Sequence, residues 1–219
     1  MVEQRGTSGS RPTRLVLLRH GRTAWNLELR AQGHADVPLD AEGELQAKAV
    51  APVLAAHRPV ALWSSDLARA RQTAACVSAE TGLEPVLDPR LREFDVGPHR
   101  VGLTIDEYAA AHPQEHAALV AGDWGAIPGR ETDQDVLDRF LPALASYVGA
   151  LGEDETGVVV SHGAALRVAT AAFLGWPAEM AAGLGGLDNC GWVELERSAS
   201  SWHGGAPRWR LRAWNRVAG

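Results

Sequence analysis

Two histidines in this chain stand where apolar segments end, a placement that suits chemistry on a phosphate ester. His20 follows the apolar run 15–18 and a glycine comes next. His162 follows the run 158–160 and also has a glycine after it. Glycine lets backbone N–H groups approach an anion, and a neutral imidazole is a nucleophile. Because ligands gather at the carboxyl ends of parallel strands, we expect both histidines to face one crevice.

Arginines accompany both positions. Arg19 and Arg22 flank His20, and Arg69 lies near the start of a predicted helix. A guanidinium binds phosphate oxygens bidentately and stays charged. Neighbouring cations also disfavour protonation of an imidazole, which would keep His20 neutral and nucleophilic. The same charges oppose a divalent metal, so a metal hydrolase built on His20, His162 and Glu93 is the weaker alternative. We expect neither metal nor cofactor.

An alkoxide leaving group needs a proton, and Glu93 in the segment LREFDVG is the predicted donor. A carboxyl group with one buried flank and one flank facing a pocket suits a general acid. Asp95 is the second candidate for this role.

The elements that would position these groups alternate along the chain. Strands are predicted at 15–18, 60–63, 85–87 and 158–160, and helices at 44–56 after a cap at Asp40, at 67–81, at 133–148 and from after Gly163 to Leu174. Repeated strand-to-helix units indicate an α/β fold. We predict a three-layer sandwich with a mostly parallel central sheet and helices on both faces.

Two further segments are expected to decorate this sandwich. Residues 97–132, rich in glycine, proline, histidine and alanine, are predicted to be an inserted cap with one helix at 105–111. Alternation at 192–195 and 209–211 predicts an antiparallel hairpin at one sheet edge, with 198–205 as its connection. The polar residues 1–13 are predicted to be a disordered tail before a single domain at 14–219.

Composition limits the classes of function. The chain has 219 residues, 46% of them hydrophobic, and a formal net charge of -6. Such a charge argues against binding along a nucleic acid. The opening residues lack the apolar stretch of a signal peptide, no run could span a bilayer, and Cys76 and Cys190 lie far apart. We expect a soluble, cytoplasmic protein that acts on a small phosphorylated metabolite, without membrane or nucleic-acid partners; a homodimer is allowed for.

Four ordered motifs together resemble the histidine phosphatase superfamily, also called phosphoglycerate mutase-like. They are RHGRTAWN at 19–26, SSDLARARQTA at 64–74, LRE at 91–93 and VVVSHG at 158–163. The resemblance implies that His20 becomes phosphorylated, that Arg19, Arg69 and His162 bind the phosphoryl group, and that Glu93 is first acid and then base. Further substrate contacts are expected at Arg22, Thr23, Asn26, Gln32, Gly33, Gly163, Ala164 and Glu131.

Within the superfamily, the AQG of 31–33 and the QTA of 72–74 resemble the phosphatase branch. The tail segments LGGLDNCGWVELE and RWRLRAWN are similar to the glucosyl-3-phosphoglycerate phosphatases. The resemblance thus implies hydrolysis of a sugar phosphate or phosphoglycerate derivative.

The chain departs from the family pattern in the cap. It has GPHRVG at 97–102 where an acidic-Trp-x-Gly string is usual, and PGRET at 128–132 replaces a double-glycine-Glu segment. His99 could reach the pocket from there. Two alternatives remain open: a cofactor-dependent phosphoglycerate mutase, which would return the phosphoryl group to another oxygen, and an inactive phosphoester-binding module.

Overall fold

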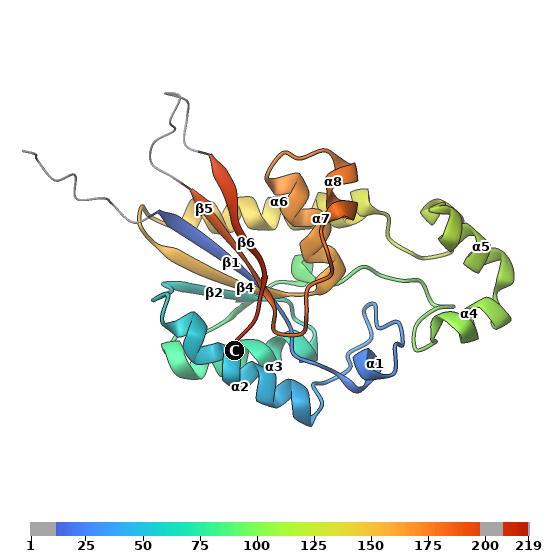
Figure 1. Cartoon of the computed structure of the whole chain (residues 1–219), viewed down its shortest axis with the longest axis horizontal. Helices are drawn as coiled ribbons and strands as arrows, with labels where there is room; N and C mark the ends of the chain where they lie inside the picture. The colour runs from blue at the N-terminus through green and yellow to red at the C-terminus, as the bar shows by residue number, and fades with distance from the viewer. Residues whose placement is uncertain (1–11, 198–207, 219) are drawn as a thin grey trace, which may run out of the picture.

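One mixed sheet forms the centre of the protein. The computed structural model describes residues 12–197 and 208–218. Within them, the sheet has six strands in the order β3-β2-β4-β1-β5-β6 (Figure 1). The strands are β1 (Thr13–Arg19), β2 (Ala61–Ser64), β3 (Val86–Leu87), β4 (Thr156–Ser161), β5 (Trp192–Arg197) and β6 (Trp209–Arg216).

The two central strands are parallel neighbours, and their apolar runs explain why they lie in the middle. Leu15 to Leu18 of β1 are all 0% exposed, as are Val158 to Val160 of β4. A strand covered on both faces needs such a continuous apolar run. Leu15 and Leu17 belong to one core cluster, whereas Val16 and Leu18 belong to the other, so alternate side chains serve the two faces of the sheet.

Helices cover both faces, which confirms the predicted sandwich. On one face lie α2 (Ala41–Ala55) and α3 (Ala68–Thr81), and on the other lie α6 (Asp133–Ala150), α7 (Gly163–Phe173) and α8 (Ala178–Gly183) (Figure 1). Asp40 caps α2 as expected, since its Oδ1 accepts from the backbone N–H of Gly43 at 2.7 Å. The short helices α1 (Ala24–Leu27) and α8 were not predicted.

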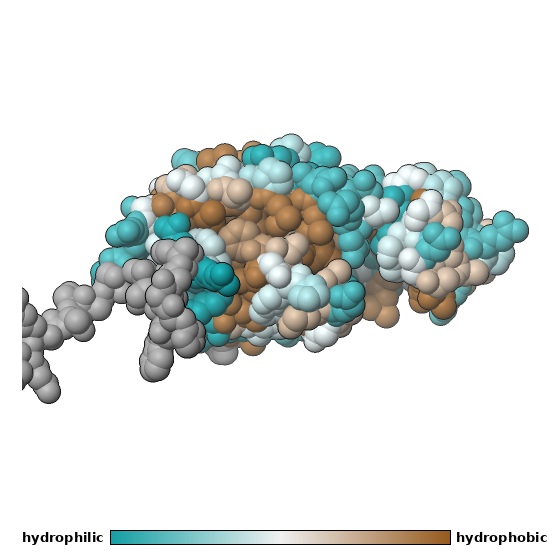
Figure 2. Space-filling model, turned by 90° about the horizontal axis from the view of Figure 1, so that it is seen from above, coloured by the Kyte–Doolittle hydropathy of each residue, from teal (hydrophilic) through white to brown (hydrophobic). Residues whose placement is uncertain are grey.

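The hairpin at the edge is also confirmed. β5 pairs antiparallel with β1, and β6 pairs antiparallel with β5. The segment 198–205, predicted as the connection, lies outside the described residues. On the face that carries α6 and α7, apolar residues gather in a hollowed area (Figure 2). Partly buried Phe173, Trp209, Leu211 and Trp214 pack against the core cluster that contains buried residues of α6 and α7.

The inserted segment 97–132 contains more structure than predicted. It holds α4 (Ile105–Ala111), as expected, but also α5 (Pro113–Ala121) and a 3-10 turn at Trp124–Ala126. Pro113 is the first residue of α5, where its missing N–H costs nothing and its fixed φ suits a helix. The prediction of a single α-helix in this segment was therefore wrong, because the segment contains two. In Figure 1 these cap helices lie at one end of the molecule, away from the sheet.

The predicted tail needs a correction at its boundary. Thr13 is the first residue of β1: it pairs with Arg197, and its hydroxyl donates to the backbone oxygen of Gly152 at 3.2 Å. The strand gains this residue from cross-strand pairing, which the apolar pattern did not indicate. Residues 1–11 lie outside the described part of the chain. Among the helices of the described part, none is long and apolar enough to cross a membrane.

Candidate active site

The parallel pairing of β1 with β4 brings His20 and His162 to the same edge of the sheet. Arg19 is opposite Ser161 in the register, so the residue after each strand is a histidine at the same level. The two imidazole rings have their centroids 5.1 Å apart at an interplanar angle of 61°. The expected meeting of the two histidines is thus present.

His20 is held so that one ring nitrogen is available. Its Nδ1 lies 2.7 Å from the backbone oxygen of Gly21. Because a carbonyl only accepts, Nδ1 carries the proton and Nε2 keeps its lone pair. Asn189 donates its side-chain amide to the backbone oxygen of His20 at 3.1 Å and fixes the loop. Burial, then the charges of Arg69 and Arg19, holds the pKa of His20 well below its usual value. The imidazole of His20 is therefore neutral, and its Nε2 can act as a nucleophile.

His162 takes the opposite tautomer because of its two partners. Arg69 donates Nε–H to its Nδ1 at 3.2 Å, so Nε2 carries the proton and donates to the Ser65 hydroxyl at 2.8 Å. Burial, followed by Arg69, His20 and Arg19, lowers its pKa well below the usual value. His162 is fully buried, and this network fixes it beside His20.

Arg69 connects His162 to the loop before α2. The side chain is 1% exposed and also donates to the backbone oxygens of Ala35 at 2.8 Å and Gly33 at 2.9 Å. Burial is the main reason why its pKa falls to about 10, which still leaves it charged at neutral pH. A buried cation of this kind suits an anionic ligand in the adjoining cavity.

Arg19 contacts the other side of the site. It donates through Nη1 to the backbone oxygen of Leu187, while its Nε is buried and has no partner among the described residues. A Cβ at position 163 would lie 3.3 Å from Arg19 Nε, so Gly163 makes room for this guanidinium. An unpartnered buried N–H is costly, and a bound anion would satisfy it.

Glu93 caps the helix that follows His162. Its Oε1 accepts from the backbone N–H groups of Phe94 at 3.0 Å and Ala165 at 2.9 Å, and Oε2 accepts from Ala164 at 3.1 Å. A carboxylate at a helix N-terminus is favoured by the dipole and by free N–H groups. The sequence predicted a carboxyl group that faces a pocket, but it did not indicate this capping of α7.

A cavity of about 490 Å³ opens in front of His20. Eight of the predicted site residues line it: Arg19, His20, Asn26, Gln32, Gly33, Arg69, Glu93 and Ala164. Gly163 lines a smaller adjoining pocket, and His162 lies buried next to Arg69. Asn26 Oδ1 accepts from Thr23 and Asn189, which leaves its amide N–H groups for a ligand.

Three predicted substrate contacts are directed elsewhere. Arg22 forms an ion pair with Asp40 at 2.8 Å, and Thr23 caps α1 with its side chain. Glu131 accepts from Arg139 Nε and Nη2 at 2.8 Å. None of the three lines the cavity, because local capping and ion pairing satisfy their polar groups first.

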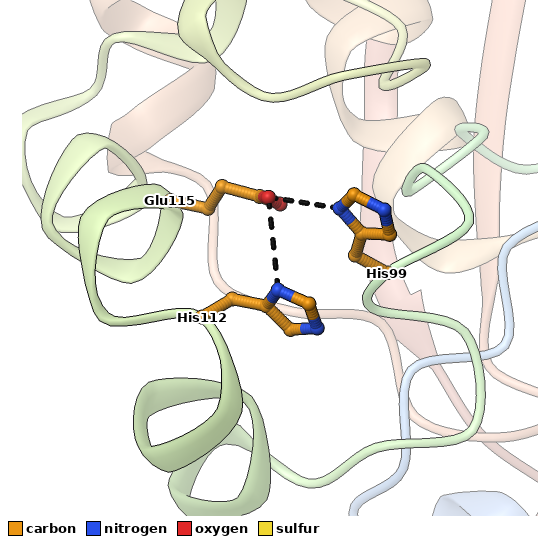
Figure 3. Close-up of side chains that lie close together, drawn as sticks. All are labelled: His99, His112 and Glu115. Carbon is orange, nitrogen blue, oxygen red and sulfur yellow. Dashed lines mark hydrogen bonds and ion pairs between the residues drawn. The ribbon is translucent and has the colours of Figure 1, made fainter.

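Asp95 and His99 also lie outside the cavity. Asp95 accepts from the backbone N–H of Gly97 at 3.0 Å. His99 binds Glu115 in the cap at 2.8 Å and stacks on His112, with ring centroids 4.7 Å apart and an interplanar angle of 1° (Figure 3). A metal lies in the plane of each imidazole that binds it, and two stacked parallel planes share no point. The cluster is therefore a hydrogen-bonded corner of the cap rather than a preformed metal site.

Several residues of the site were missed by sequence reasoning. Arg100 and Arg130 of the cap and Arg167 of α7 line the cavity, as does Trp124. Ser65 and Asn189 position the two histidines. The signal for Arg100 and Arg130 was present in the sequence, since both belong to the segments GPHRVG and PGRET that depart from the family pattern.

The low pKa values of His20 and His162 make folding stability depend on pH. The unfolded chain takes up protons on these side chains near pH 6.5, whereas the folded protein does so only at much lower pH, so stability falls as the pH drops below 6.5. Each histidine is expected to contribute about 1.4 kcal/mol per pH unit below that value. Denaturant unfolding at a series of pH values measures this slope, which should be shallower in His20→Gln; an unchanged slope in that variant would contradict the buried neutral state of His20.

Comparison of the sequence with known protein families agrees with the geometry of this site. A family model for the histidine phosphatase superfamily (branch 1) matches residues 15–214. The chain belongs to this superfamily.

Similar proteins in this superfamily include phosphatases and a probable mutase. A glucosyl-3-phosphoglycerate phosphatase from Mycolicibacterium vanbaalenii is 39% identical over 220 residues, which cover 95% of this chain and 96% of the relative. The structure of a mycobacterial glucosyl-3-phosphoglycerate phosphatase with VO3 superposes with a TM-score of 0.81 at 37% identity and covers 93% of this chain and 99% of its own. A probable phosphoglycerate mutase from an Enterobacter species is 37% identical over 193 residues, 86% of each chain.

Proposed function

We propose that this protein hydrolyses the phosphate ester of glucosyl-3-phosphoglycerate through a phosphohistidine on His20. One observation carries the proposal: a neutral His20 with Nε2 unprotonated faces a cavity whose lining includes Arg19, Arg69 and Glu93. The arginines neutralise the phosphoryl oxygens, and Glu93 donates a proton to the leaving oxygen and later accepts one from water. No metal ion is needed for either task.

The reaction runs in two displacements. His20 Nε2 attacks phosphorus while the bond to the alcohol oxygen breaks, and Glu93 gives its proton to that oxygen. Water then attacks the phosphohistidine, loses a proton to Glu93 and restores the imidazole. Oε2 of Glu93 has one backbone donor where Oε1 has two, so Oε2 is the oxygen assigned to carry the proton.

The remaining groups stabilise the transferring phosphoryl group. The buried Nε of Arg19 lacks a partner among the described residues, and the amide of Asn26 faces the same cavity. Arg69 contributes its charge while holding His162 in one tautomer. His162, locked between Arg69 and Ser65, keeps a second neutral ring beside the phosphorus.

The choice of substrate rests on the relatives and on the cavity. Two of the compared proteins bear the name glucosyl-3-phosphoglycerate phosphatase and are covered almost entirely. A cavity of about 490 Å³ lies within the range for small-molecule sites and suits one sugar with one phosphoglycerate. An inactive binding module is disfavoured, because both His20 and Glu93 line this cavity.

The rival activity is that of a phosphoglycerate mutase, which the Enterobacter relative supports. The two activities differ in the acceptor of the second step, which is water in one and a sugar-acid hydroxyl in the other.

The purified protein is expected to release inorganic phosphate from glucosyl-3-phosphoglycerate in the presence of EDTA, because arginines and not a metal neutralise the phosphate. Phosphate release and conversion of 3-phosphoglycerate to 2-phosphoglycerate are measured side by side. Isomerisation that outpaces phosphate release would assign the mutase activity instead, and loss of activity that zinc or magnesium restores would assign a metal enzyme.

Three expectations beyond the reaction stay predictions. A cytoplasmic location and the absence of nucleic-acid partners follow from the composition alone. For a homodimer, the edge strand β6 is the candidate contact, because an uncovered strand edge tends to pair with another chain. Light scattering after gel filtration measures the mass that decides this point.

A further inference from the structure

The cavity in front of His20 contains more positive charge than a single phosphoryl group needs. Its lining includes six arginines but only two acidic residues, Glu93 and Asp133. Arg19 and Arg69 lie next to His20. Arg30 is paired with Glu28 at 2.8 Å and with Glu107 at 2.6 Å. Three arginines therefore remain to be explained: Arg100, Arg130 and Arg167.

These three arginines lack acidic partners. Among the described residues, none of them forms an ion pair with a carboxylate. The Nε atoms of Arg130 and Arg167 are buried and have no hydrogen-bond partner in the described part of the chain. Nearly all buried polar groups in folded proteins are hydrogen-bonded, and both of these side chains line the same cavity, which points to a ligand there.

Packing holds at least one of these guanidinium groups in place. Arg130 lies over the ring of Trp124, with its Cζ 4.0 Å from the ring centroid, and donates Nη1–H to the backbone oxygen of Glu131 at 2.8 Å. Val96, which precedes the segment 97–102, forms a backbone bridge with Arg130 of the segment 128–132. A guanidinium stacked on an aromatic ring keeps its edge free for an oxygen acceptor.

Repulsion between Arg100 and Arg130 is only partly compensated. Burial and then the charge of Arg100 lower the pKa of Arg130, and burial lowers that of Arg100. The acids of the lining relieve this only in part: Glu93 accepts three backbone N–H groups, and the charge of Asp133 raises the pKa of Arg130 without outweighing burial and Arg100. A cluster of like charges with too little counter-charge is stabilised when an anion binds.

We propose that Arg100, Arg130 and Arg167 form a second anion subsite that binds a carboxylate on the alcohol part of the substrate. A carboxylate matches the guanidinium fork bidentately, and the cap and α7 contribute to it from two sides. The subsite deepens the proposed function, since glucosyl-3-phosphoglycerate carries a carboxylate beside its phosphate ester. The same arginines would select against neutral sugar phosphates of similar size.

The test uses two substrates that differ at one position. 3-Phosphoglycerate has a carboxylate where glycerol 3-phosphate has a hydroxymethyl group, and phosphate release gives kcat/KM for each. We expect the protein to favour the carboxylate substrate, and Arg130→Gln and Arg167→Gln each to reduce that preference about 10- to 100-fold. Activity on glycerol 3-phosphate should change little in both variants. Arg130→Lys, which keeps the charge but loses the fork, should restore only part of the preference.

Arg30→Gln is the matched control, because it removes a positive charge from the same lining while that charge is already paired with carboxylates. It should keep the preference, and thermal unfolding of all variants identifies any that fail to fold. Equal losses on both substrates, or wild-type protein without a carboxylate preference, would overturn the subsite. If the preference is present but glucosyl-3-phosphoglycerate is not hydrolysed, the proposed substrate fails while the subsite stands.

Discussion

His20→Ala should reduce phosphate release by about 10⁴-fold or more, because the change removes the nucleophile and leaves no other group able to take its place. Ser65 and His162 are fully buried and engaged with each other. The fold should persist, since His20 lies at a strand end with only its Nδ1 hydrogen bond to Gly21 lost. Steady-state rates on p-nitrophenyl phosphate measure the loss, and circular dichroism measures the fold.

A rapidly quenched reaction tests directly whether phosphate becomes bound to His20. Wild-type protein mixed rapidly with labelled substrate should retain acid-labile, alkali-stable phosphate, and His20→Ala should retain none. His116→Ala serves as the control, since His116 lies in α5 of the cap, outside the cavity lining. Label on a serine or aspartate, or substantial turnover by the variant, would exclude His20 as the nucleophile.

Glu93→Gln is expected to separate substrates by their leaving groups. Hydrolysis of an alkyl phosphate should fall about 10²- to 10⁴-fold, because the alkoxide needs a proton as the bond breaks. Nitrophenolate leaves without one, so phosphorylation of His20 by p-nitrophenyl phosphate should be nearly unaffected. The second displacement also loses its base, and a burst of nitrophenolate followed by a slow steady rate should appear in rapid mixing experiments.

The structure adds a second consequence of this substitution. Glutamine keeps one oxygen for the N–H groups of Phe94 and Ala165, but it places an NH₂ group where Oε2 accepts from Ala164. We therefore expect a loss of about 1 kcal/mol in the free energy of unfolding as well. That loss is too small to mimic the effect on the alkyl substrate.

Asp95→Asn is the control for the leaving-group effect. Asp95 was the other candidate acid, but its Oδ1 binds the backbone N–H of Gly97 and it does not line the cavity. The ratio of rates on the two substrates should stay at the wild-type value in this variant. If Glu93→Gln lost equal activity on both substrates without a burst, Glu93 would act only as the cap of α7.

The central features of the site were within reach of the sequence because they depend on short segments. The runs at 15–18 and 158–160 are apolar enough to be buried on both faces, and each ends at a histidine and a glycine. Two parallel neighbours with this ending must present both histidines at one sheet edge. Cap residues such as Asp40 follow equally local rules, since the partner N–H lies three residues away.

Other features depended on pairings between distant residues, and these were decided by the tertiary structure. Glu93 meets Ala164 across 71 positions of sequence, and Arg69 meets His162 across 93. Glu131, expected to contact substrate, lies against Arg139 instead. A local sequence pattern cannot predict such partners, because a side chain pairs with whichever groups the packing of the fold brings close to it.

The sequence by itself thus determined the sheet, the two histidines at strand ends and Arg19 next to His20, since burial of apolar runs and the ends of strands are encoded within a few residues. Only the tertiary structure decided the tautomers of His20 and His162, the capping of α7 by Glu93, and the grouping of Arg100, Arg130 and Arg167. In those arrangements, donors and acceptors from separate segments pair with one another. Which of them pair depends on the distances between them and on their burial in the folded chain.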